Sequence, residues 1–139
     1  MRKLPLLVVA TLMAGCQTPL PAVDPQMAWV DFSTPSPGGK LLMAERLDNQ
    51  RLNDGRYFQV TPGSHELRVR FDFEVFGGGG ALLTGPVERL CYLYIRYDHF
   101  EAGQRYVLEG RSLAFTPSAR LYNSKREIVA EDYDYNCII

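Results

Sequence analysis

The sequence predicts an all-β fold, an antiparallel β-sandwich of about seven to eight strands with an extended segment in front of it. Three observations predict it. A long central stretch alternates strictly between apolar and charged residues, and a second long apolar-rich stretch follows soon after it. The rest of the chain holds short segments rich in aromatic and β-branched residues, separated by turns of Pro, Gly, Asn and Asp.

The clearest strand is expected at residues 65–76. Charged residues at alternate positions face one way, and the apolar residues between them face the other, namely Leu67, Val69, Phe71, Phe73 and Val75. A period of two residues is typical of a strand with one face in the core and one in water. A helix would scatter these apolar residues around its circumference.

A second long strand is expected at residues 87–98. Here Cys91, Leu93, Ile95 and Tyr97 alternate with Leu90, Tyr92, Tyr94 and Arg96. Because only residues 77–86 join the two long strands, an extended antiparallel hairpin is the expected arrangement.

The remaining strands are expected to be short. Residues 41–47 could also form a helix, but the turn residues after them favour a strand. The expected short strands are residues 27–32, 41–47, 56–60, 104–111, 113–115, 119–123 and 127–131. Such a set suggests a sandwich or a barrel, and we expect one sandwich domain over residues 27–139.

The chain begins with two basic residues, a short apolar run over residues 4–13, and Ala14-Gly15-Cys16. The run is too short to cross a bilayer as a helix, which needs roughly 20 residues. The segment resembles a bacterial lipoprotein signal peptide with its lipobox, except that Met13 stands where that family usually has Leu. The alternative is a buried N-terminal strand or helix, but Pro5 and the polar sequence from Gln17 disfavour it.

The resemblance implies removal of residues 1–15 and attachment of fatty acyl chains to Cys16. Two or three chains would hold the protein stably at a membrane. Gln17, in place of an Asp, implies the periplasm-facing leaflet of the outer membrane. Residues 16–26 contain three prolines and are expected to form a flexible, extended tether.

Cys91 and Cys137 remain after Cys16 is assigned to lipid. In an oxidising compartment such a pair is expected to form a disulfide, which would clamp the C-terminus and stabilise the fold by about 4 kcal/mol. The alternative is a pair of buried free thiols.

Residues 47–71 are similar to PEGA-like β-sandwich modules of bacterial envelope proteins, in which a hairpin leads through a turn into a long strand. Pro62-Gly63-Ser64-His65 matches that turn. Residues 100–108 look like a strand-turn-strand found in uncharacterised envelope lipoproteins. The resemblance implies a fold and carries no catalytic residues.

Enzymatic signals are weak. The chain has two histidines, His65 and His99, and no Gly-x-Ser-x-Gly motif. Ser64 and His65 are neighbours only in sequence, and a loose metal site at Asp98, His99 and Glu101 is the less favoured alternative to solvated loop residues. We therefore expect no enzyme, cofactor or metal. The net charge of −1 excludes a basic surface for nucleic acid.

Two segments are candidates for partner binding. Tyr92, Tyr94 and Arg96 share one strand face and are residue types enriched at binding hot spots, unless a second sheet covers them. The Gly-rich stretch at residues 77–86 lacks the lysine of a phosphate-binding loop. It is expected to be a flexible hairpin tip, or a tip that touches a membrane or partner through Leu82 and Leu83.

Residues 131–135 are acidic and aromatic and are expected to form a solvated surface segment before Cys137, in preference to a calcium loop. Together these features predict a non-enzymatic binding or scaffolding lipoprotein that contacts another envelope protein or the cell wall. The alternatives are an inhibitor of a cell-wall hydrolase that acts through residues 77–86, and an enzyme that would need His65, His99 and carboxylates to converge.

Overall fold

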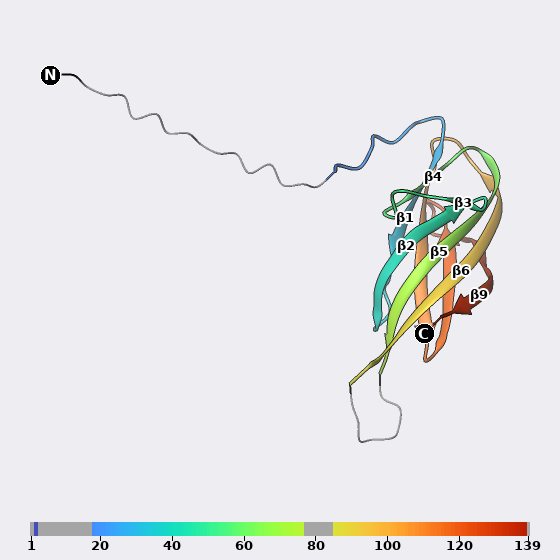
Figure 1. The fold of residues 1–139 in the computed structure, drawn as a ribbon. Coiled ribbons are helices and arrows are strands. Elements are labelled where there is room, and N and C mark those ends of the chain that lie inside the picture. The colour runs from blue at the N-terminus through green and yellow to red at the C-terminus, as the bar shows by residue number, and fades with distance from the viewer. Residues whose placement is uncertain (1, 3–17, 77–84, 139) are drawn as a thin grey trace.

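The computed structural model describes residues 2, 18–76 and 85–138, so the signal peptide, Cys16, Leu82 and Leu83 lie outside the described residues. The described residues form strands and turns with no helix (Figure 1). Among these residues there is no helix with the length and hydropathy needed to cross a bilayer. The strands are β1 (Ala28–Ser33), β2 (Gly39–Leu47), β3 (Gln50–Arg51), β4 (Phe58–Val60), β5 (Gly63–Val75), β6 (Val87–Phe100), β7 (Arg105–Leu113), β8 (Thr116–Tyr122) and β9 (Ile128–Cys137).

The strands are hydrogen-bonded in the order β3-β2-β5-β6-β9-β8-β7-β1-β4. Strand β9 belongs to both halves of this order, because Glu131 pairs with β8 and the next residue, Asp132, pairs with β6. The sheet therefore turns back on itself at β9 and forms two layers. Figure 1 shows β2, β5 and β6 in the front layer, with the other layer behind them.

The all-β fold, the long hairpin and most of the short strands are confirmed. Strands β5 and β6 pair antiparallel along their length, with Val69 opposite Leu93, and residues 41–47 belong to a strand. The structure differs in two details from the expected antiparallel sandwich of about seven to eight strands. The described chain has nine strands, and β1 pairs parallel with β7, since the long stretch between them supplies the crossover that parallel pairing requires.

One expected short strand is wrong, and another is longer than expected. Residues 113–115 do not form a strand, because Leu113 ends β7 and Ala114 adopts a positive φ of 50° in the turn to β8. Residues 131–135 lie at the surface as expected, but they belong to β9 and pair with β6 and β8, so the strand expected at 127–131 continues to Cys137. Their side chains are largely exposed, which explains why their composition suggested a solvated segment.

The core lies between the two layers and is built from the inward residues of the alternating strands. Phe71 of β5 meets the other layer at Gly110 of β7, where an added Cβ would lie 3.1 Å from the Phe71 ring. The main inward side chains are Val30, Phe58, Leu67, Val69, Phe71, Phe73, Leu93, Ile95, Leu108 and Leu121. Trp29 is as buried as the others although it lies on the outer side of β1, where Tyr57 stacks on it with ring centroids 4.3 Å apart.

Cys91 and Cys137 face each other across β6 and β9 and form the expected disulfide, with an S–S distance of 2.00 Å. Cys91 is fully buried. The alternative of two free thiols is therefore wrong, and the C-terminal strand β9 is covalently fixed to β6.

Residues 18–27 reach the domain at the end opposite the β5–β6 connection (Figure 1). The Thr18 carbonyl accepts a hydrogen bond from Arg56 at 2.8 Å, and the Met27 carbonyl accepts one from the backbone N–H of Gly103 at 2.9 Å. The segment before β1 thus contacts the β4 and β6–β7 regions before the chain enters the core.

Candidate functional site

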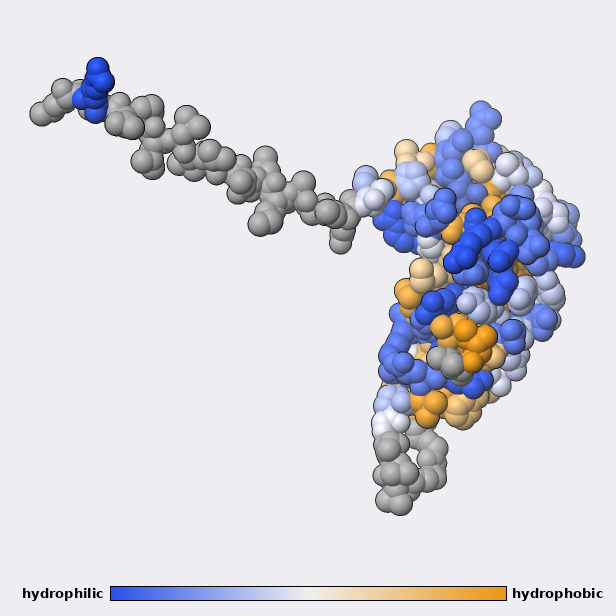
Figure 2. Space-filling view, in the orientation of Figure 1, coloured by the Kyte–Doolittle hydropathy of each residue, from blue (hydrophilic) through white to orange (hydrophobic). Residues whose placement is uncertain are grey.

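The outward face of the front layer is the main candidate site, and we call it the tyrosine–arginine face. The alternation that buries Cys91, Leu93 and Ile95 in the core turns the residues between them to the outside. The described face is largely hydrophilic (Figure 2). Its aromatic and cationic members are Arg46, Arg68, Arg70, Tyr92, Tyr94, Arg96 and Tyr133, drawn from β2, β5, β6 and β9.

The structure therefore places Tyr92, Tyr94 and Arg96 on the side that faces away from the second layer. The alternative in which that layer covers them is wrong. Tyr92 and Tyr94 are half-buried by their neighbours on the face, whereas the Arg96 side chain is 61% exposed.

The tyrosine rings are covered by arginines rather than by the core. The Arg68 guanidinium carbon lies 4.5 Å from the ring centroid of Tyr92 and 5.4 Å from that of Tyr94. Tyr133 lies 6.2 Å from Tyr94, and Arg96 lies 6.0 Å from the Tyr133 ring. These are cation–π and aromatic distances, so the rings and guanidinium groups hold one another in place.

Two arginines of the face have carboxylate partners. Arg96 forms an ion pair with Glu66 at 2.8 Å, and Arg70 donates two hydrogen bonds to Asp72 at 3.0 Å each. The Asp72 carboxylate raises the pKa of Arg70, so the guanidinium of Arg70 stays charged. Partial burial, followed by the nearby Glu66 carboxylate, raises the pKa of Tyr133, so its phenol stays neutral at neutral pH.

The residues considered for nucleophilic catalysis have separate structural partners. Ser64 donates its hydroxyl hydrogen to Asp98 at 2.8 Å, whereas the His65 ring contacts Asp48 at 2.5 Å and the Thr61 carbonyl at 2.7 Å. Burial alone would raise the pKa of Asp48, but the Glu66 backbone N–H and His65 lower it. These hydrogen bonds stabilise the turn that leads into β5. Because Ser64 and His65 bond to different partners, they do not form a nucleophile–base pair.

His99 is exposed at the end of β6, with its ring 6.1 Å from that of Tyr97. Across residues 2, 18–76 and 85–138, no three His, Cys, Asp or Glu side chains gather in a way that could hold a metal ion.

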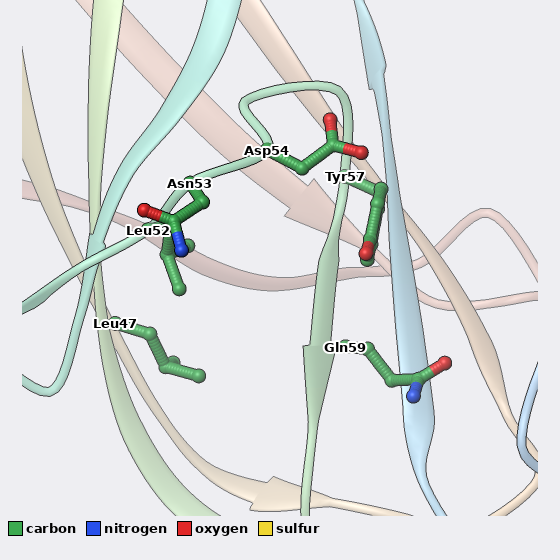
Figure 3. Close-up of a pocket in the computed structure, with 6 residues that line it drawn as sticks. All are labelled: Leu47, Leu52, Asn53, Asp54, Tyr57 and Gln59. Carbon is green, nitrogen blue, oxygen red and sulfur yellow. The ribbon is translucent and has the colours of Figure 1, made fainter. Parts of the chain in front are cut away.

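A small cavity of about 270 Å³ opens between the β2–β3 region and β4 (Figure 3). Leu47 and Leu52 lie across from Tyr57 and Gln59, and Asn53 and Asp54 lie at one end. The Asp54 carboxylate is already paired with Arg56 at 2.7 Å. The cavity is slightly smaller than a typical ligand site, and its lining offers no unpaired charge to orient a substrate.

The end of the domain with the β5–β6 connection carries exposed apolar side chains. Phe76 and Val87 flank that connection and are 59% and 52% exposed, while Leu113 beside the β7–β8 turn is 82% exposed. The expectation that Leu82 and Leu83 form an apolar tip falls on residues outside the described part, as does most of the proposed inhibitory loop at 77–86.

Three members of the tyrosine–arginine face were predicted from the sequence as a binding surface, namely Tyr92, Tyr94 and Arg96. The others were not, namely Arg46, Arg68, Arg70 and Tyr133. Arg68 and Arg70 were visible as the charged side of the alternating strand, but their positions beside the tyrosines depend on strand register, which the sequence pattern does not fix. Comparison of the chain with models of known families, with characterised proteins and with solved structures found no match.

Proposed function

We propose that this chain is a lipid-anchored, periplasm-facing lipoprotein of the bacterial outer membrane, and that its β-domain is a non-enzymatic binding module. The domain docks onto another envelope protein through the tyrosine–arginine face. One observation carries the proposal: Tyr92, Tyr94 and Tyr133 lie with arginines on an outward sheet face. Tyrosine and arginine are enriched at the energetic centres of protein interfaces.

The state of these side chains supports docking to a protein. The tyrosine rings are held by arginine and aromatic neighbours, so little side-chain freedom would be lost on binding. The other clusters of polar residues in the described chain have internal partners, as at Ser64 and His65, and offer no catalytic geometry.

Site-directed photo-crosslinking in intact cells tests the docking. A photoreactive phenylalanine analogue replaces Tyr133, which is 58% exposed on the face. The matched control replaces Arg120, an exposed residue of β8 on the opposite layer. We expect one discrete crosslinked envelope protein from position 133 and none from position 120, and we expect Tyr94→Ala to reduce the crosslink.

The same crosslinked product from both positions, or none from position 133, would overturn docking through this face. Recovery of a cell-wall hydrolase from position 133 would identify the partner as an enzyme and revive an inhibitory role, although through this face rather than residues 77–86.

Cell fractionation of Cys16→Ser tests the anchor. Without the thiol, no thioether to lipid can form, so the variant is expected in the soluble periplasmic fraction while the wild type stays with the membrane. Unchanged membrane association of the variant would contradict the lipid anchor.

A further inference from the structure

Three arginines on neighbouring strands lie side by side across the tyrosine–arginine face. We call Arg51, Arg46 and Arg68 the arginine row. Arg51 of β3 pairs with Arg46 of β2, and Arg46 pairs with Arg68 of β5. Arg68 in turn pairs with Tyr94 of β6. Because directly paired residues of antiparallel strands share a face, the three side chains leave the sheet on the same side. With strands about 4.8 Å apart, the row spans about 10 Å.

The arginine row has no carboxylate partner among the described residues. No ion pair there involves Arg46, Arg51 or Arg68, although Arg70 and Arg96 on the same face are each paired. The only side-chain hydrogen bond of the row runs from Arg46 to the Asn49 carbonyl, at 3.2 Å, within the described chain. Like charges placed directly opposite one another destabilise a sheet. The three arginines therefore repel one another, and a bound anionic ligand would reduce this repulsion.

Arg68 is the most constrained member of the row. Its Nε atom is buried without a hydrogen-bond partner, and its guanidinium lies over two tyrosine rings. The Nε atom of Arg46 is buried and unpartnered in the same way. A guanidinium held in a fixed position is well suited to bind a carboxylate through two parallel hydrogen bonds.

The surroundings of the arginine row favour a narrow acidic ligand over a broad anionic surface. Glu66 lies beside the row, and Asp72, Glu74 and Glu88 lie farther along the same face. A membrane leaflet that covered the face would meet these carboxylates as well as the arginines. A single acidic segment that crosses β3, β2 and β5 would meet the row and avoid Asp72, Glu74 and Glu88.

We propose that the arginine row binds a short Asp- or Glu-rich segment of the partner protein, with Arg68 as its central anchor. The inference rests on the proposed function, because it names the chemistry of the partner at the tyrosine–arginine face. It also predicts that binding weakens as salt is added, since its attraction is between exposed charges.

The test uses the full chain carrying Cys16→Ser and a hexaglutamate peptide as the probe. NMR of the arginine Nε–Hε groups is expected to show saturable shifts at Arg46, Arg51 and Arg68. Arg68→Gln is expected to weaken peptide binding about tenfold, equivalent to about 1.4 kcal/mol. The matched control Arg120→Gln removes an arginine of β8, in the other layer, that is already paired with Glu131, and is expected to change the affinity much less.

Arg68→Lys keeps the charge and loses the planar fork, so its affinity is expected to fall between those of Arg68→Gln and the wild type. Urea unfolding of each variant shows whether the fold is intact, and Arg68→Lys serves as the test if Arg68→Gln is unfolded. Shifts that do not saturate, or an equal loss of affinity in Arg120→Gln, would overturn the proposal. So would row shifts with phosphatidylglycerol vesicles and none with the peptide.

The two proposals fail separately. If position 133 still crosslinks to one envelope protein but hexaglutamate does not bind, the acidic-segment inference fails and docking stands. If hexaglutamate binds at the row but position 133 gives no crosslink, docking through this face fails and only the anion site remains.

Discussion

The Asp132 carboxylate accepts a hydrogen bond from the backbone N–H of Ala119 at 2.7 Å. This contact lies where β9 leaves β8 and joins β6, so the N–H of Ala119 has no β9 backbone carbonyl opposite it. A side-chain oxygen thus completes the hydrogen bonding of β8 at the corner between the two layers, where an unpaired buried N–H would be costly.

Asp132→Ala is expected to lower the free energy of unfolding by about 1–2 kcal/mol, because it leaves the Ala119 N–H without its acceptor. Asp132→Asn keeps a carbonyl oxygen at that position and is expected to lose less. Asp134→Ala is the control, since that carboxylate bonds only the adjacent Tyr135 N–H within the described residues. Equal urea midpoints for Asp132→Ala and Asp134→Ala would show that the corner contact contributes nothing.

Gly110→Ala is expected to destabilise the domain by about 1–3 kcal/mol, because the core is too tightly packed to admit a methyl group there. The added Cβ would lie 3.1 Å from the Phe71 ring and 3.4 Å from Leu42, both buried. Gly85→Ala is the matched control, since a Cβ at that exposed site meets nothing within 4 Å. Thermal unfolding of the two variants gives the comparison, and similar losses would argue against tight packing between the layers.

Removal of the disulfide by Cys91→Ala with Cys137→Ala is expected to lower the free energy of unfolding by up to about 4 kcal/mol. The bond closes a long loop, with 46 residues of separation, and restricts the unfolded chain. Thiol labelling of the denatured, non-reduced protein is expected to modify neither Cys91 nor Cys137. Labelling of both cysteines would contradict the bond in the cell-derived protein.

The Asp31–Arg105 pair predicts a contribution to acid unfolding. Two hydrogen bonds from Arg105 hold the pKa of Asp31 below its usual value; partial burial opposes them, and the Trp29 indole N–H adds to them. A carboxylate whose pKa is lower in the folded state stabilises the fold above its unfolded pKa, about 3.9, and loses that contribution as the pH falls through its folded pKa.

Asp31→Asn is therefore expected to be less stable than the wild type at pH 7, with the difference shrinking below about pH 3.9. Urea unfolding of both proteins from pH 7 down to pH 2 measures this convergence. A difference that stays constant to the lowest pH would show that the charge of Asp31 is not the cause.

The sequence was most informative where side chains alternate. The alternation in β5 and β6 predicted both strands and their buried faces, because a half-buried strand must repeat every two residues. The parallel pairing of β1 with β7 has no such local signal, since it joins segments that are far apart in the chain. The mostly exposed residues 132–137 of β9 likewise hid how far this strand extends, because at the corner between the layers they cover little of the core.

The candidate site was only partly predictable for a related reason. Tyr92, Tyr94 and Arg96 could be assigned to one face from a single strand. The arginine row could not, because it consists of one residue from each of three strands. A shift of one residue in the pairing of β2 with β5 would turn Arg46 or Arg68 to the opposite face.

The position of β1 between two hydrogen-bonded neighbours gives the domain a mechanical property. Residues 18–27 lead directly into β1, which lies between β4 and β7 and pairs with β7 from Trp29 to Ser33. If a membrane holds the N-terminal segment and a partner holds the front layer, tension acts along the axis of β1. The hydrogen bonds on both sides of β1 are then loaded in shear and must break together, so the strand resists extraction far better than one peeled from an edge.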